Sequence, residues 1–210
     1  MTSVRAPECR RWPAWLAAAA ALWAPDLRAA PSPPPPQSGI YESLVLAIAA
    51  DGTLTGHFRE QLGSRPVREC AFFLSGRDGQ VVAWSAGEAG VIRGRLTPDG
   101  AGVTLTLAQV RDLPGCASVL SPDAGDGLRL ERTQGGDWRG LAVVAAPRAR
   151  LYPSATASRS TAYVVAGDVL AVSSGREGRL QVTYVNEEGL ALRMWIDAAL
   201  IEAVRPRAQP

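Results

Sequence analysis

Asp-Gly dipeptides recur between short, strand-like segments in the first half of the chain. They occupy positions 51–52, 78–79 and 99–100, and a fourth at 126–127 precedes "LRLER". Because glycine accepts a positive φ, and turns built on positive φ match the twist of the flanking strands, the first three predict β-hairpins. Seven short strands with this spacing predict an all-β antiparallel meander, closed into a barrel or packed as a sandwich, over residues 39–131.

The side-chain pattern of these strands is compatible with two kinds of interior, a packed core and a ligand cavity. "GVTLTLAQV" alternates apolar and polar residues, which is typical of a strand with one solvated face, whereas "AFFL" and "LVLAIAA" are continuously apolar. Such runs indicate strands that are covered on both sides or strands whose inner face lines a cavity. In the second case Phe72, Leu74 and Trp84 would line a calyx for a small apolar ligand, which requires a cavity of about 300 Å³ or more.

The N-terminal segment predicts an exported protein. Arginines precede the apolar run "AWLAAAAALWA", which is too short to span a bilayer, since a spanning helix needs about 20 apolar residues. We therefore expect residues 1–30 to be a signal peptide with an undetermined cleavage site, and residues 31–38 to be an extended proline-rich linker. The mature chain is expected to be periplasmic or secreted without a stable membrane span, and residues 205–210 are expected to be a disordered tail.

The cysteines agree with export. Without the leader's Cys9, Cys70 and Cys116 remain as a pair, which predicts a disulfide in an oxidising compartment, with two free thiols as the alternative. A metal site is not expected, because His57 is the sole histidine of the chain and zinc needs more Cys or His ligands nearby. No cofactor is expected either.

Charge excludes one class of partner. The first thirty residues hold four of the 22 basic residues and two of the 20 acidic ones, so equal numbers of both signs remain after them. A neutral chain with interspersed charges has no electrostatic footprint for nucleic acid.

The C-terminal part, which we expect to form a domain over residues 138–204, resembles a bacterial SH3-like domain over about residues 145–203. The resemblance is carried by "LYPS", "AYVVAGDVLAV", "LQVTYVN" and "WIDAAL", and it implies a small five-stranded barrel of the kind appended to envelope proteins. The upstream segments "DGTLTGHF", "ECAFF" and "LPGC" are similar to lipocalin-like barrel domains. Two positions depart from the SH3-like pattern, since Arg179 stands where tryptophan is common and Met194 where glycine usually precedes the tryptophan.

The stretch 179–200 predicts a hairpin in its own right. Alternation places Leu180, Val182 and Tyr184 on one face of the first strand. It places Leu190, Leu192 and Met194 on one face of the second, with a turn at residues 186–189.

Aromatic residues of the C-terminal part are candidates for a ligand groove. The candidates are Tyr152, Tyr163, Tyr184 and Trp195; SH3-like barrels that bind peptides use aromatic grooves. For Tyr184 and Trp195 the sequence favours core packing over ligand binding, because we expect them to lie among apolar neighbours.

Catalytic motifs are missing from the sequence. His57 and Glu60 lie in one strand without a nucleophile motif, and no Gly-x-Ser-x-Gly, His-Glu-x-x-His or phosphate-binding glycine loop occurs. We therefore expect a non-enzymatic exported binding protein of the bacterial envelope that contacts a peptide, cell-wall fragment or protein. The alternatives are a carrier of a small apolar ligand and an inhibitor or stabiliser of an envelope enzyme.

Overall fold

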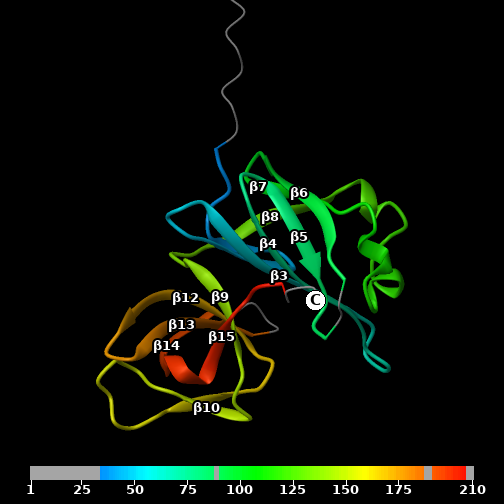
Figure 1. The fold of residues 1–210 in the computed structure, drawn as a ribbon. Helices are drawn as coiled ribbons and strands as arrows, with labels where there is room; N and C mark the ends of the chain where they lie inside the picture. The colour runs from blue at the N-terminus through cyan, green and yellow to red at the C-terminus, as the bar shows by residue number, and fades with distance from the viewer. Residues whose placement is uncertain (1–33, 88–89, 187–190, 207–210) are drawn as a thin grey trace, which may run out of the picture. The chain divides into compact units, whose positions relative to one another are not determined.

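The computed structural model describes residues 34–87, 90–186 and 191–206. The predicted signal peptide, the start of the linker, residues 187–190 and residues 207–210 lie outside them. The described chain is all-β, as predicted, and consists of an N-terminal barrel followed by a C-terminal module of two smaller sheets (Figure 1). Both belong to one compact unit, Pro33–Pro210.

The N-terminal barrel is a closed antiparallel meander in which each strand pairs with the next. It closes where β1 pairs with β8, with Gly39 opposite Gly135. The sequence predicts seven strands over residues 39–131, whereas the barrel has eight, the last of which ends at Gly135. The strands are β1 (Gly39–Tyr41), β2 (Leu44–Ile48), β3 (Thr53–Leu62), β4 (Arg68–Arg77), β5 (Gln80–Trp84), β6 (Ile92–Asp99), β7 (Gly102–Thr106) and β8 (Leu128–Gly135).

The Asp-Gly turns lie where the sequence predicts them, between β2 and β3, β4 and β5, and β6 and β7. Gly52, Gly79 and Gly100 all have positive φ. The additional strand arises from a break in the first apolar segment, where Glu42 adopts a φ of 48° and turns the chain from β1 into β2. A glutamate in the left-handed region is uncommon and is imposed here by the tertiary fold. The alternation of side chains along a strand does not predict it.

The barrel interior is filled with side chains. Phe58 and Phe72 are fully buried and stack with ring centroids 4.7 Å apart, and Leu74 is fully buried in the same cluster. The β7–β8 connection adds Val110, Leu113, Leu120 and Ala124 to this core. It carries three short 3₁₀ segments, η1 (Val110–Asp112), η2 (Cys116–Ser118) and η3 (Ala124–Asp126).

The predicted disulfide is present. Cys70 on β4 and Cys116 in η2 are bonded, with Cα atoms 4.3 Å apart and a sequence separation of 46 residues, and both side chains are fully buried. The bond therefore anchors the β7–β8 connection to the wall of the barrel.

The C-terminal module contains a five-stranded sheet in the order β14-β13-β12-β9-β15 and a two-stranded ribbon, β10–β11. Tyr152 and Trp195 join the two through a backbone bridge. The elements are β9 (Gly140–Val144), β10 (Arg148–Leu151), β11 (Ala162–Val165), β12 (Val169–Arg176), β13 (Arg179–Val185), β14 (Ala191–Asp197), η4 (Ala198–Leu200) and β15 (Ile201–Ala203).

The predicted hairpin at residues 179–200 is confirmed in its pairing. β13 and β14 are antiparallel, with Val182 opposite Met194. Val182 is buried in the core of the C-terminal module, and Leu180 and Tyr184 pack against that core, as expected from their shared face. Leu192 departs from the expectation, since it is 46 % exposed. Leu190 and three of the four turn residues lie outside the described residues.

A third apolar cluster joins the barrel to the C-terminal module. Trp138, between β8 and β9, is 2 % exposed, and its indole Nε1 donates to the Thr183 hydroxyl of β13 at 3.1 Å. Its carbonyl oxygen accepts a hydrogen bond from Ser38 at 2.6 Å, and Thr55 on β3 accepts one from the Leu141 amide at 2.9 Å. The two modules are therefore packed against each other and are not merely connected by a linker.

The position of Trp84 differs from the expectation that it lines a calyx inside the barrel. It is buried in this joining cluster with Ile40, Ala47 and Trp138, on the outer surface of the barrel, and it pairs with the outward-facing Phe73. Trp84 therefore lines no calyx. Phe72 and Leu74 do point inward but are part of a packed core.

Candidate functional site

A pocket of about 620 Å³ lies between the barrel and the C-terminal module. Its lining residues come from segments 40–45, 57–61 and 69–71 of the barrel and from segments 167–171 and 183–186 of the C-terminal module. We call this the inter-module pocket. On the barrel side it is lined by outward-facing residues of two strands, among them His57 and Arg59 on β3 and Glu69 on β4.

His57 lies in the barrel wall of the pocket. Alternation along β3 directs Phe58 into the barrel and His57 outward, where its ring packs against Phe73 with centroids 4.9 Å apart. Burial, together with the nearby positive charge of Arg59, lowers the pKa of His57 from 6.5 to about 4. His57 is therefore neutral at neutral pH and supplies hydrogen-bonding capacity rather than charge.

An ion pair borders His57. Arg59 on β3 donates from Nη2 to Glu69 Oε2 on β4 at 3.0 Å, and Gln61 Nε2 donates to the same oxygen at 2.6 Å. The hydrogen bond from Gln61, together with Arg59, lowers the pKa of Glu69 below its ordinary value. The positive charge of Arg59 is therefore matched by a carboxylate of the neighbouring strand.

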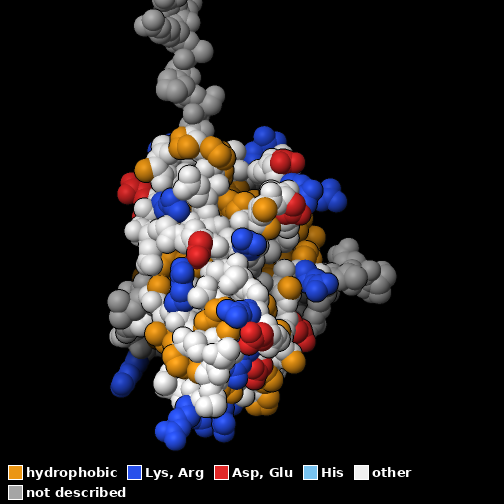
Figure 2. Space-filling model, turned by 90° about the vertical axis from the view of Figure 1, so that its left-hand side faces the viewer, with side chains coloured by type: hydrophobic (Ala, Val, Ile, Leu, Met, Phe, Trp, Pro, Cys, Tyr) orange, Lys and Arg blue, Asp and Glu red, His pale blue; other side chains and the backbone are white. Residues whose placement is uncertain are grey.

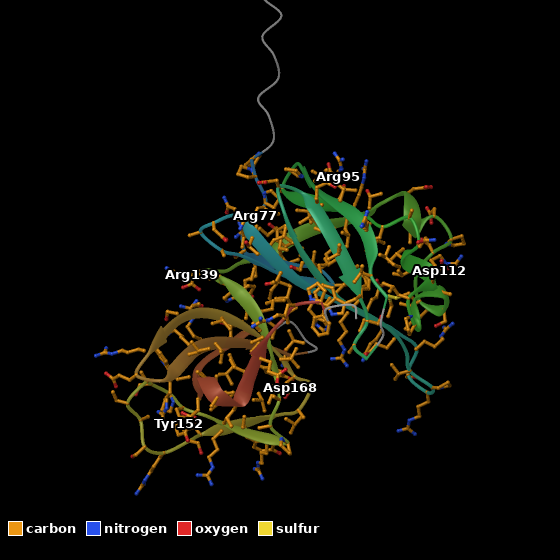
Figure 3. The ribbon with its side chains drawn as sticks, viewed as in Figure 1. Arg77, Arg95, Asp112, Arg139, Tyr152 and Asp168 are labelled. Atoms are coloured by element: carbon orange, nitrogen blue, oxygen red, sulfur yellow. A yellow bond between two sulfur atoms is a disulfide. The ribbon has the colours of Figure 1, made fainter. Side chains whose placement is uncertain are left out.

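The opposite wall comes from β12, β13 and the turn before β12. Asp168 in this turn accepts a hydrogen bond from the Val165 amide at Oδ2, 2.7 Å away. Val169, Ala171 and Val185 add apolar surface to the same wall. Figure 3 shows Asp168 and Tyr152 at well-separated places on the C-terminal module.

The four predicted groove residues do not gather at one site. Tyr184 lines the inter-module pocket. Tyr163 is 54 % exposed on β11, with the Arg148 guanidinium 3.8 Å above its ring. Tyr152 forms backbone hydrogen bonds of 2.8 Å in both directions with Trp195. The structure thus pairs Tyr152 with Trp195 and separates both from Tyr184.

Arg179, the departure from the SH3-like pattern, has a structural role. Its guanidinium lies 3.7 Å from the Tyr152 ring centroid, bonds Asp197 Oδ1 at 3.0 Å and donates to the Ala157 carbonyl oxygen at 2.8 Å. One face of the Tyr152 ring is therefore already covered by a cation of the same chain.

The position of Trp195 also differs from the expectation, which placed it in the core. In β14 the buried residues are Met194 and Ile196, so strand parity points Trp195 to the other side of the sheet, where it is half-buried. Tyr184 follows the expectation more closely, because it packs against the core with Val182.

Four pocket residues could not be identified from the sequence: Arg59, Gln61, Glu69 and Asp168. Polar residues on the outer face of a strand are typical of any solvated face, so their pattern gives no signal of a site. Their significance depends on the C-terminal module lying opposite them.

Comparisons with family models, with curated proteins and with solved structures found no match for this chain. None of the helices in the described residues is long and apolar enough to cross a membrane.

The neutral state of His57 makes stability depend on pH. A histidine whose folded pKa lies below its unfolded value of 6.5 binds more protons in the unfolded chain between pH 6.5 and 4. Its contribution is complete above pH 6.5 and declines as the pH falls toward 4, by about 3 kcal/mol in total. Urea unfolding at pH 7.5 and 4.5 should therefore show a smaller loss for His57→Gln than for the wild type, with Arg59 and Glu69 unchanged in both. Equal losses in the two proteins would contradict the assignment.

Proposed function

We propose that this chain is a non-enzymatic binding protein of the bacterial envelope and that its ligand occupies the inter-module pocket. The observation that carries the proposal is the pocket itself. At about 620 Å³ it falls within the range of about 300–1,000 Å³ that is typical of small-molecule and peptide sites, which occur preferentially between domains.

The lining also has the composition of a binding site. Apolar residues on both walls, such as Val45 and Val169, stand beside polar groups that include His57, Gln61 and Asn186. Apolar surface supplies affinity, and a few placed polar groups fix the ligand's orientation. The packed contact around Trp138 holds the two walls together, which limits the conformational entropy lost on binding.

Export remains part of the proposal. The leader-like N-terminus and the buried disulfide support an oxidising compartment, because such bonds persist there and are rare in the cytosol. On the face shown in Figure 2, basic and acidic side chains both occur, interspersed with apolar and uncharged ones, which supports a partner other than nucleic acid.

A variant that fills the pocket tests the proposal. Ala71 lies on the outer face of β4 and lines the pocket, so Ala71→Phe should occupy ligand volume without entering the barrel core. We expect the immobilised mature protein to retain a component of an envelope extract, identified by mass spectrometry. Retention should fall at least about tenfold in the variant, because the added ring excludes the ligand from its contacts.

Thr104→Phe is the matched control, since it adds the same ring to β7 outside the pocket lining. A component retained by the wild type and the control but lost with Ala71→Phe supports the proposal. Undiminished retention by Ala71→Phe would overturn the placement of the site.

A further inference from the structure

The charges lining the inter-module pocket are unequal. Among the described residues of the lining, four are acidic and Arg59 is the one arginine, while His57 is neutral at neutral pH. The Arg59 charge is paired with Glu69 at 3.0 Å. Glu60 shares the Phe58 side of β3 and so points away from the pocket. The other two acids, Glu42 and Asp168, give the lining a net negative charge.

The acids are dispersed around the pocket rather than gathered. Glu42 lies in the β1–β2 turn, whereas Asp168 belongs to the opposite wall. Within the described residues no group of three or more His, Cys, Asp or Glu side chains could hold a metal ion. A bare cation would leave most of this volume empty, so the arrangement favours an organic cation of some length.

The apolar lining fits the stem of such a cation. Val45 and Ala71 line the barrel side, and Val169 and Val185 line the opposite side. An aliphatic chain between them would be removed from water while its charged end stays close to carboxylates, which is how long basic side chains are commonly bound.

We propose that the inter-module pocket binds an alkylammonium or alkylguanidinium group, as presented by a lysine or arginine side chain or by a free amine. This inference rests on the proposed function and adds the ligand's chemical class. It combines the pocket's volume, the apolar surface on its two walls and the excess of carboxylates around them.

Nuclear magnetic resonance titration of the mature protein tests the ligand class. The probes are an acetylated, amidated Ala-Lys-Ala peptide, its norleucine and glutamate counterparts, and pentylamine. We expect the lysine peptide to shift the amides of Val45 and Val169, and the norleucine peptide to bind at least about fivefold more weakly, because it keeps the stem and loses the charge. Similar affinity for pentylamine would assign the natural source to small amines, and clearly weaker binding of pentylamine would assign it to a peptide.

Charge-neutral variants locate the interaction. Asp168→Asn keeps an oxygen acceptor for the Val165 amide, and Glu42→Gln preserves shape. Each should weaken lysine-peptide binding about two- to fivefold, as expected for a partly exposed ion pair. Glu131→Gln on β8 is the control and should have no effect, because Glu131 lies outside the pocket lining.

Two results would overturn the inference. One is norleucine- or glutamate-peptide binding that equals or exceeds that of the lysine peptide; the other is the absence of shifts at the pocket with either cation up to about 10 mM. If this occurs while Ala71→Phe still abolishes retention of an envelope component, the binding function stands and the ligand class is wrong. If Ala71→Phe also has no effect, both proposals fail.

Discussion

Replacing Trp138 with alanine is expected to lower the free energy of unfolding by about 3–5 kcal/mol, the range typical of large-to-small changes at buried tryptophans. Trp138 is 2 % exposed and packs between the outer surface of the barrel and the C-terminal sheet. The alanine would leave a cavity in the joining cluster and remove the indole partner of the Thr183 hydroxyl, which is itself buried.

Urea unfolding followed by far-ultraviolet circular dichroism measures this effect. Trp195→Ala is the matched control, because it deletes the same side chain from a half-buried position outside the three apolar clusters. Its cost should be clearly smaller. If Trp138→Ala costs no more than the control, the contact between the modules contributes little to stability.

Removing the disulfide is expected to have the second-largest effect. The bond closes a loop over a sequence separation of 46 residues, for which the chain-entropy account gives a contribution of about 4 kcal/mol. The Cys70→Ala, Cys116→Ala double variant should therefore unfold at a markedly lower urea concentration than the oxidised wild type.

Reduction of the wild-type protein provides the comparison without any substitution. The reduced wild type and the double variant should lose similar stability, since both release the β7–β8 connection from β4. A loss below about 1 kcal/mol in both would mean that packing of Val110, Leu113 and Leu120 holds this connection without the bond.

The strands of the barrel were largely predictable because their signals are local. Asp-Gly turns with positive φ and alternating side chains, as on β7, depend on neighbouring residues alone, and they predicted the hairpins correctly. The disulfide was predicted from the two cysteines that remain once the leader-like segment is set aside. The break at Glu42 was not predicted, because it depends on the geometry of barrel closure, which the local pattern of residues does not reveal.

Most of the candidate site could not be predicted from the sequence. His57 was singled out for its chemistry, but its surroundings depend on which face of the barrel the C-terminal module covers. Trp84 illustrates the same limit, because an aromatic residue on a strand suits a lumen, a core or a packed outer face equally well. For Trp195, the outcome depended on strand parity relative to Met194 and Ile196, which are the buried residues of β14.

Closure of the barrel through β1 and β8 has a consequence for the order of folding. Strands β2 to β7 pair with sequence neighbours, but Gly39 must meet Gly135, so the ring is completed only after nearly a hundred residues have been brought together. Such a non-local step costs loop entropy before it gains contacts, and slows folding accordingly. Until β8 has formed, β1 keeps an unpaired edge, and the folding chain is most open to wrong pairing or proteolysis during that interval.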